Sequence, residues 1–155
     1  MRFRILFFCL WASFFSFAQQ TPENTKTPTP YPVSTHPFDY KGRQLIVGQA
    51  LGKLEKEYRL LEDGGVYRRV NTVGEFEVLG EQSKKNIETA FKSLDDVGFE
   101  KINFQHPSRE SYFIIFKNGK KEHKVIWGDP KHPAPEGVKR VYRAFMGMIP
   151  QSMRL

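Results

Sequence analysis

The stretch WGDPKHPAPEG, residues 127–137, contains the residue types that acid–base or cation chemistry requires. Asp129 and His132 lie among its prolines, and the pair could hold a proton or a cation if the loop folded back on itself. A hydrolase also needs a nucleophile or an activated water, and a pocket that stabilises developing charge. The chain contains neither G-x-S-x-G nor H-E-x-x-H. We therefore expect no catalytic residue, and a small hydrolase that uses Asp129 and His132 is the last of the alternatives.

The same stretch is also explained as a stiff connector between a strand and a helix. The proline after Asp129 keeps that residue out of the helical region, and Pro135 is placed to begin the last helix. A rigid, exposed loop beside a tryptophan is suited to contact another molecule. Trp127, Asp129 and His132 are therefore candidate contact residues.

The histidines do not share a spacing that is typical of metal ligands. His36, His106, His123 and His132 are dispersed along the chain, and no H-x-x-x-H pair occurs. Cys9 is the one cysteine, and it lies within the expected leader described below. The mature chain then has no thiolate ligand and no disulfide. The sequence predicts no metal site and no cofactor.

Three arginines fall on a predicted hairpin. A turn at Asp63–Gly64 would place Arg59 opposite Arg68, with Arg69 on the other face beside two tyrosines. Like charges directly opposite each other are unfavourable unless an acid or an anion lies between them. The arginines could therefore grip an acidic group, or their stems could lie over aromatic rings with the charged heads in water.

A second basic group lies in KNGKKEHK. Lys120 and Lys121 sit at the tip of another predicted hairpin. Lysine at a hairpin tip also protects a sheet edge against aggregation. With the three arginines, these lysines are candidate contacts for a polyanion or an acidic protein surface.

Alternation and turn residues predict the strands that position these side chains. Asn118–Gly119 separates two strand-like runs and favours a two-residue hairpin turn. This turn pairs Phe116 with Lys121, and it pairs Ile114 with His123. The second face of the hairpin is either covered by a helix or offered to a partner. The first face would consist of Tyr112, Ile114, Phe116, His123, Val125 and Trp127.

Another hairpin is predicted between residues 54–61 and 66–70, with its turn at either Asp63–Gly64 or Gly64–Gly65. A short strand, RQLIVG, precedes it, and Gly48, Ala50 and Gly52 would make the bend between them.

Apolar residues recur at helical spacing in two segments. In SKKNIETAFKSLDDVG, Ser83 is a plausible N-cap and Gly98 a plausible residue after the C-cap. The segment PEGVKRVYRAFMGMI repeats the pattern near the end of the chain. The sequence therefore predicts an α+β fold in the order β-β-β-α-β-β-α. Two hairpins and a short first strand would form a small antiparallel sheet covered by two helices.

The N-terminal part of the chain predicts secretion. Residues 1–18 combine Arg2 and Arg4 with a short apolar run and small residues before Gln19, which is typical of a signal peptide. Lipidation at Cys9 is disfavoured because bulky Phe8 precedes it. The run is too short to span a bilayer, so we expect a secreted or periplasmic protein with no transmembrane segment after cleavage. Residues 19–38 would form a Pro/Thr-rich linker, and residues 39–155 one α+β domain.

The charge of the chain is moderately positive. The full sequence has 24 basic and 17 acidic residues, and loss of the two leader arginines leaves 22 − 17 = +5. Nucleic-acid binding domains carry a stronger, clustered excess, so no nucleic-acid partner is expected. Envelope polyanions or an acidic protein surface are the expected partners.

The order of these motifs resembles a known group of proteins. YRLLEDGGVYRRV, a capped helix, YFIIFKNGKKEHKVIWGDP and a final helix cover residues 44–149. They resemble small secreted or lipid-anchored envelope proteins of Gram-negative bacteria, most of which have no assigned function. The layout is also distantly similar to emfourin-type inhibitors of thermolysin-like metallopeptidases. Here GQALGK replaces their Gly-Gly turn, and no functional residue is carried over.

These observations predict a secreted, non-enzymatic module that binds a protein or an envelope component. The alternatives are a proteinaceous peptidase inhibitor, a polyanion or lipopolysaccharide binder, and the small hydrolase described above. The predicted contact residues are Arg59, Arg68, Arg69, Lys120, Lys121, Trp127, Asp129 and His132.

Overall fold

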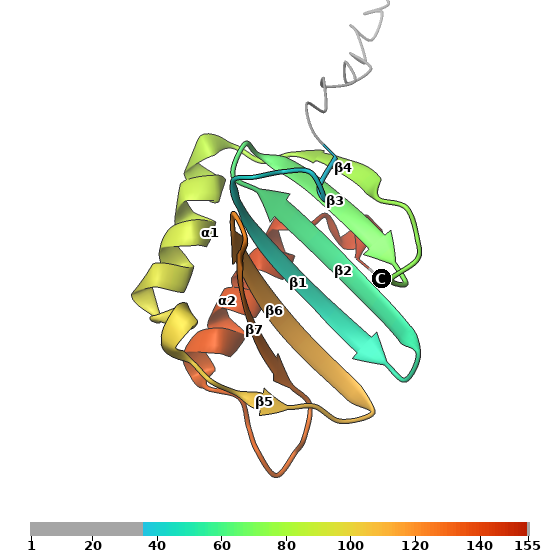
Figure 1. Ribbon diagram of the computed structural model, residues 1–155, viewed down its shortest axis with the longest axis vertical. Helices are drawn as coiled ribbons and strands as arrows, with labels where there is room; N and C mark the ends of the chain where they lie inside the picture. The colour runs from blue at the N-terminus through green and yellow to red at the C-terminus, as the bar shows by residue number, and fades with distance from the viewer. Residues whose placement is uncertain (1–35, 155) are drawn as a thin grey trace, which may run out of the picture.

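The computed structural model describes residues 36–154, so the expected leader and most of the expected linker lie outside the described residues. The fold is α+β, as predicted, with both helices on one face of a single sheet (Figure 1). The sheet has seven strands and is mixed, so it is larger than the small antiparallel sheet that we expected. The strands are β1 (Arg43–Leu51), β2 (Leu54–Leu61), β3 (Gly65–Val70), β4 (Glu77–Glu81), β5 (Gln105–His106), β6 (Glu110–Asn118) and β7 (Lys121–Trp127). The α-helices are α1 (Lys84–Asp96) and α2 (Glu136–Met148), and the 3-10 turns are η1 (Phe99–Lys101) and η2 (Gln151–Met153).

The central strand β1 joins the two predicted hairpins into one sheet. The order is β4-β3-β2-β1-β6-β7-β5, and β1 is antiparallel to both β2 and β6. The edge strands β4 and β5 were not predicted. β4 pairs with β3 through an irregular register, and β5 pairs in parallel with β7 over two residues. Both are too short or too irregular to show the alternation from which a strand is recognised.

The register of the β2–β3 hairpin differs from the prediction by one residue. Leu60 pairs with Val66, and Arg59 pairs with Tyr67 rather than with Arg68. The turn is centred on Asp63, whose side chain accepts a hydrogen bond from the Gly65 amide at 3.1 Å. A shift of one residue moves a side chain to the other face of the sheet. The predicted pairing of Arg59 with Arg68 is therefore wrong, and the two residues lie on opposite faces.

The β6–β7 hairpin is shifted by two residues along one strand. Its turn is Gly119–Lys120, and Phe116 pairs with His123 rather than with Lys121. Of the turn residues only Gly119 has a positive φ, 59°, as in a type II′ turn. A shift of two residues preserves the face of every side chain. The predicted composition of the two faces is thus correct even though the predicted partners are not.

The first strand continues through the expected bend. β1 extends to Leu51, and the chain turns only at Gly52, which has a φ of 60°. Gly48 lies inside the strand, opposite Phe113 of β6. The bend that we expected around Gly48 and Ala50 is therefore wrong, because Gly48 serves close packing between strands and not a change of direction.

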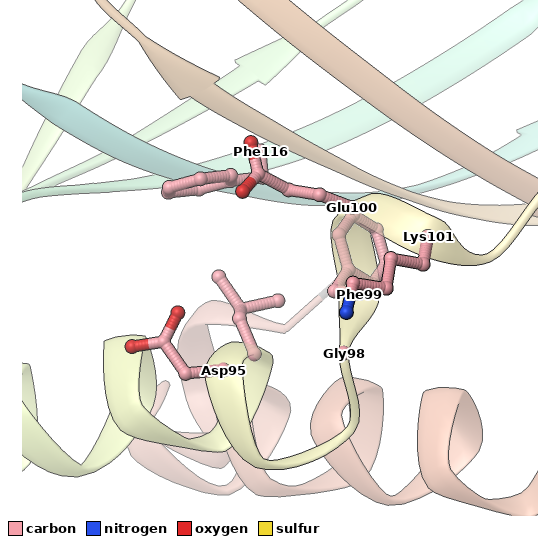
Figure 2. Close-up of a pocket in the computed structure, with 7 residues that line it drawn as sticks. Asp95, Gly98, Phe99, Glu100, Lys101 and Phe116 are labelled. Carbon is pink, nitrogen blue, oxygen red and sulfur yellow. The ribbon is translucent and has the colours of Figure 1, made fainter.

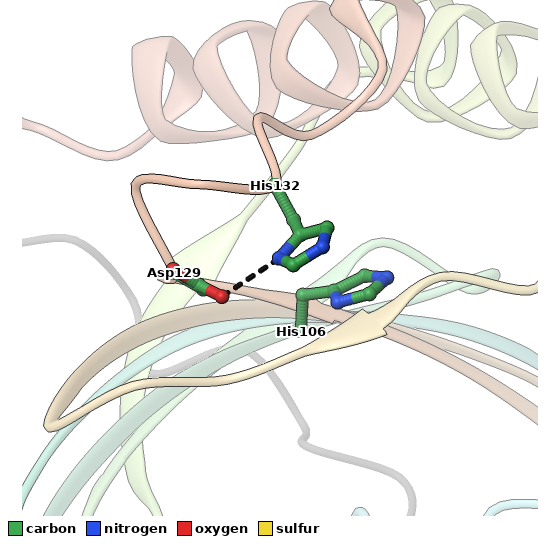
Figure 3. Close-up of side chains that lie close together, drawn as sticks. All are labelled: His106, Asp129 and His132. Carbon is green, nitrogen blue, oxygen red and sulfur yellow. Dashed lines mark hydrogen bonds and ion pairs between the residues drawn. The ribbon is translucent and has the colours of Figure 1, made fainter.

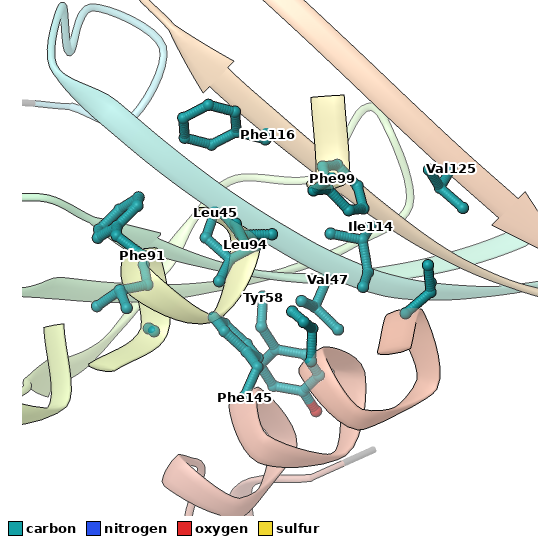
Figure 4. Packing of buried hydrophobic residues seen from close by; sticks show 14 of the residues in the cluster. Leu45, Val47, Tyr58, Phe91, Leu94, Phe99, Ile114, Phe116, Val125 and Phe145 are labelled. Carbon is teal, nitrogen blue, oxygen red and sulfur yellow. The ribbon is translucent and has the colours of Figure 1, made fainter. Parts of the chain in front are cut away.

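The helices follow the prediction closely. Ser83 caps α1 by accepting a hydrogen bond from the Asn86 amide at 3.3 Å, and Gly98 after it has a φ of 59°. Both helices pack on the same face of the sheet, where the core cluster lies (Figure 4). Neither helix covers the other face (Figure 1). The main core cluster therefore lies between the helices and the sheet, while Ile46, Leu61, Tyr67 and Phe113 are buried on the opposite face. Its largest members include Leu45, Tyr58, Phe91, Leu94, Phe99, Ile114, Phe116 and Phe145.

Candidate functional site

The loop that follows β7 folds back on itself around Asp129. Its carboxylate oxygen Oδ1 accepts a hydrogen bond from the Lys131 amide at 2.9 Å, and its carbonyl accepts one from the His132 amide at 3.1 Å. The other carboxylate oxygen, Oδ2, lies 2.7 Å from Nδ1 of His132 (Figure 3). The hydrogen bond from His132, followed by that from the Lys131 amide, lowers the pKa of Asp129. The loop thus folds back on itself, as the hypothesis of a proton or cation site required, and the two side chains meet.

A third residue, His106, joins this pair from the edge of the sheet. His106 belongs to β5 and pairs with Trp127 of β7. Its carbonyl accepts a hydrogen bond from the Asp129 amide at 3.1 Å. Its ring stacks on that of His132, with centroids 4.2 Å apart and planes 13° apart. One potential ligand atom from each of His106, Asp129 and His132 lies within 4.8 Å of the other two.

Gly128 lets the two segments approach so closely. A Cβ atom at this position would lie 2.2 Å from the carbonyl oxygen of Glu110 and 3.0 Å from the Ser108 hydroxyl. Ser108 and Ser111 are themselves joined by two hydrogen bonds of 2.8 Å, so the facing turn is held rigidly. Only glycine fits at position 128 without moving this backbone.

An aromatic cluster supports the loop from the sheet. Trp127 stacks on its cross-strand partner Tyr112 at a centroid distance of 5.9 Å. Tyr142 of α2 contacts both rings edge-on, at 5.4 Å from Trp127 and 5.6 Å from Tyr112. Burial raises the pKa of Tyr142, and the nearby Tyr112 and Tyr58 hydroxyls add to this effect. The three rings are half-buried, so the cluster is part of both the packing and the surface.

Four connections gather at the end of the sheet that carries this cluster. Strand pairing places the β1–β2, β3–β4, β5–β6 and β7–α2 connections at one end, which we call the loop end (Figure 1). Three exposed large apolar side chains lie there: Leu51 is 50% exposed, Val70 38% and Val73 94%. Leu51 and Val70 share a face of the sheet, because each pairs with a residue on that face of β2. Scattered exposed apolar residues are ordinary, and only a contiguous exposed patch is typical of a contact surface.

Hydrogen bonds hold the backbone of the β3–β4 loop, which carries Val73. Nη1 of Arg69, a buried side chain, donates a hydrogen bond to the Thr72 carbonyl at 2.8 Å. The Asn71 amide donates to the Glu55 carbonyl at 2.6 Å, and the Gly74 amide donates to the Asn71 carbonyl at 3.1 Å. Asn71 has a φ of 63°, a conformation that asparagine tolerates better than most residues. These bonds fix the backbone around an almost fully exposed valine.

Arg59 and Arg69 are paired with a buried acid and do not face water. One oxygen of Glu57 lies 2.8 Å from Nε of Arg59, and the other lies 3.2 Å from Nη2 of Arg69. All three side chains are less than 10% exposed. Phe38 and Phe76 lie over both guanidinium groups, with ring centroids 4.6–5.2 Å from the guanidinium carbons. Both arginines therefore lie beneath aromatic rings with their charged heads buried.

The remaining basic candidates lie elsewhere. Arg68 is on the helix-facing side, where it pairs with Glu77 at 2.5 Å and donates to the Met153 carbonyl at 3.0 Å. Lys120 and Lys121 are exposed at the tip of the β6–β7 hairpin. This tip is separated from Trp127 by the length of β7, about 20 Å at the rise of a strand. The structure thus brings Asp129 and His132 into contact, with Trp127 at the end of β7 just before them, and separates this loop from Lys120 and Lys121.

Two cavities are small and lie away from the predicted contact residues. One has a volume of about 210 Å³ and opens between the end of α1, η1 and β6 (Figure 2). The other, of about 130 Å³, lies between α1 and α2. Sites that enclose a small molecule measure roughly 300–1,000 Å³. The first cavity is lined by Leu94, Asp95, Gly98, Phe99, Glu100, Lys101 and Phe116.

Sequence reasoning missed His106 and Glu57 as site residues. His106 is distant from His132 along the chain, and only the parallel pairing of β5 with β7 brings the rings together. Glu57 alternates with its neighbours as any strand residue does, and its role between two arginines follows from the register of β2 and β3. The one local sign of an extended segment at His106 was the proline that follows it, because a residue before proline is disfavoured in a helix.

The comparisons with known proteins give no family for this chain. No protein-family model matches it, and no curated protein matches it. The resemblance to envelope proteins and to peptidase inhibitors stays a prediction. Among residues 36–154, no helix is both long enough and apolar enough to cross a membrane.

Proposed function

We propose that this protein is a secreted or periplasmic, non-enzymatic module that binds another protein through the loop end of its sheet. The observation that carries the proposal is the presence of three exposed apolar side chains at the loop end. Leu51 and Val70 end strands β1 and β3, and Val73 lies in the β3–β4 loop. Exposed apolar groups on a fixed backbone lose little conformational freedom on binding, which favours association. Secretion is inferred from residues 1–18 alone.

Trp127 and the two tyrosines beside it extend the same surface. Tryptophan and tyrosine are enriched where protein interfaces are strongest, since each combines a large apolar ring with a polar atom. The ring of Trp127 is half-buried between Tyr112 and Tyr142, so its position is set before any partner arrives. Such a surface suits a protein partner better than a polyanion, because Arg59 and Arg68 are already paired with Glu57 and Glu77.

The proposal is tested by comparing two ends of one molecule. Val73→Asp and Leu51→Asp place charges on the loop end, whereas Lys120→Glu with Lys121→Glu changes charge at the opposite tip. All four positions are exposed, so the variants are expected to fold. Each is used as bait on extract from the producing cells, and captured proteins are quantified by mass spectrometry. We expect a partner that is lost with the aspartate variants and kept with the lysine variants. Identical capture by all variants contradicts the proposal.

The β3–β4 loop favours a second candidate, a proteinaceous peptidase inhibitor. A backbone pinned by Arg69 and Glu55, with Val73 94% exposed at its tip, can enter a peptidase groove without being ordered first. Thermolysin-like and serine peptidases are assayed with the purified protein at micromolar concentration. Inhibition that Val73→Asp removes supports this candidate, and unchanged rates for both classes of peptidase eliminate it.

A further inference from the structure

The cluster of His106, Asp129 and His132 points to a ligand that the proposed function does not include. We propose that these three side chains bind one divalent transition-metal ion, of the Zn²⁺ class, at the loop end of the sheet. Their potential ligand atoms lie within 4.8 Å of one another. Two imidazole nitrogens and one carboxylate oxygen form a set that suits Zn²⁺, Cu²⁺ or Ni²⁺ and not Mg²⁺ or Ca²⁺, which prefer oxygen ligands alone.

Two of the three residues are already fixed in place. The 3.1 Å hydrogen bond from the Asp129 amide to the His106 carbonyl ties the two backbones together. The carboxylate of Asp129 is oriented by the Lys131 amide at 2.9 Å. Gly128 lets this loop lie against the Glu110 backbone, so the loop cannot move away without losing that contact. The protein therefore holds the backbones of His106 and Asp129 together, with the Asp129 carboxylate oriented, before any ion binds.

The third residue has room to complete the site. Around Zn²⁺, ligand atoms at about 2.0–2.1 Å from the metal lie roughly 3.3 Å apart in a tetrahedron. The present separation of up to 4.8 Å must shrink, and the parallel rings of His106 and His132 must tilt toward a common point. The side chain of His132 is 52% exposed, so it can rotate without disturbing the core. The adjustment required is a rotation of the exposed His132 side chain together with a tilt of the His106 ring.

The bond between Asp129 and His132 shows what the ion replaces. A carboxylate only accepts hydrogen bonds, so Nδ1 of His132 carries the proton in the 2.7 Å contact with Asp129 Oδ2. The metal ion takes the place of this proton on Nδ1 and joins the same two residues. A neutral ring keeps its proton by carrying it on Nε2 instead, whereas a doubly protonated ring releases one proton to solvent. His106 supplies the third ligand and water the fourth. An ion here links β5 to the loop after β7 and leaves an open position toward solvent.

The test measures metal binding alone, so its result is independent of any partner. Zn²⁺ is titrated into the purified protein by calorimetry, in a Cys9→Ser background so that the one thiol does not contribute. We expect one ion per chain, and affinity at least tenfold weaker for each of His106→Ala, Asp129→Asn and His132→Ala. His36→Ala, which removes an exposed histidine outside the cluster, is the matched control and retains full affinity. Mg²⁺ gives no binding.

Two further readouts separate loss of the site from loss of the fold. Co²⁺ bound by nitrogen and oxygen ligands in a tetrahedron absorbs visible light, and this absorption is expected to disappear in His132→Ala. The thermal unfolding midpoint is expected to rise with Zn²⁺ in the parent protein but not in His132→Ala. Absence of binding at micromolar Zn²⁺ overturns the inference, and so does equal affinity in the parent protein and the three cluster variants. If Zn²⁺ binds but no partner is captured, the metal site stands and the proposed function fails.

Discussion

The ring of Phe113 on β6 lies directly over Gly48, its cross-strand partner on β1. A Cβ atom built on Gly48 would lie 2.2 Å from Cζ of Phe113 and 2.5 Å from the carbonyl oxygen of Lys56 on β2. Phe113 is 1% exposed, and Nζ of Lys124 lies 4.9 Å from its ring centroid on the sheet face that neither helix covers. A glycine in a strand interior usually weakens it. Here the missing side chain of Gly48 leaves space on the sheet, and the phenyl ring of Phe113 occupies that space.

Gly48→Ala is expected to destabilise the protein by about 3 kcal/mol, at the upper end of the cost of overpacking. The phenyl ring could move aside, but the Lys56 carbonyl belongs to the ladder between β1 and β2 and cannot. Denaturant unfolding followed by circular dichroism measures the difference. Gly147→Ala is the control, since nothing lies within 4 Å of its Cβ position near the end of α2. That change is expected to be neutral or stabilising, and equal effects would refute the packing argument.

Glu57→Gln is expected to cost about 3–5 kcal/mol, the usual penalty for removing one member of a buried ion pair. The change leaves Arg59 and Arg69 buried next to each other without a carboxylate, and Nε of Arg69 already has no hydrogen-bond partner. Thermal or urea unfolding measures the loss. Asp96→Asn, which breaks an exposed pair with Lys92, is the matched control and should cost less than about 1 kcal/mol. Similar losses for the two variants would show that burial does not matter here.

Glu62 should make stability depend on acid. Its carboxylate accepts hydrogen bonds from Nε and the amide of Arg43, at 2.9 and 3.1 Å, and these bonds lower its pKa. A lowered pKa means that the unfolded chain takes up this proton first, so the contribution is present above the ordinary value of 4.5 and lost as pH falls below it. The pair is exposed, so the contribution is about 0.5 kcal/mol.

Urea unfolding at several pH values checks this expectation with Glu62→Gln. The variant should be less stable than the parent protein at neutral pH, and the two should converge in acid. A constant difference at all pH values would mean that the charge of Glu62 is not responsible.

Helices were predicted better than strand pairing, and the reason is physical. The cap at Ser83 and the αL residue at Gly98 are local signals, because the bonds that satisfy a helix end come from nearby residues. Register depends instead on which turn residue adopts a positive φ. Asp63–Gly64 and Asn118–Gly119 each allow more than one turn, and the structure uses neither of the predicted ones. Of the two register errors, only the one-residue error in the β2–β3 hairpin assigned side chains to the wrong face of the sheet. It therefore gave Arg59 the wrong cross-strand neighbour.

The candidate site was predicted in part for the same reason. Asp129 and His132 are three residues apart and meet in a turn that proline and aspartate favour. His106 reaches them through a parallel strand of two residues, which no periodicity reveals. Glu57 likewise meets Arg69 only because β2 and β3 pair in one particular register. Contacts within one loop could be predicted from the sequence. Contacts between strands depend on how the strands pair in the sheet, which the sequence pattern did not reveal.

Tyr142 should make the protein unstable in alkali. Burial raises its pKa, so the unfolded chain loses the phenolic proton at a lower pH than the folded protein does. Its contribution is full below the ordinary value of 10.0 and falls as pH rises above it. Tyr142→Phe keeps the edge-on contacts with Trp127 and Tyr112 but has no proton to lose. In urea unfolding at increasing alkaline pH, the variant should lose stability less steeply than the parent protein. Parallel curves would assign the alkaline sensitivity to other groups.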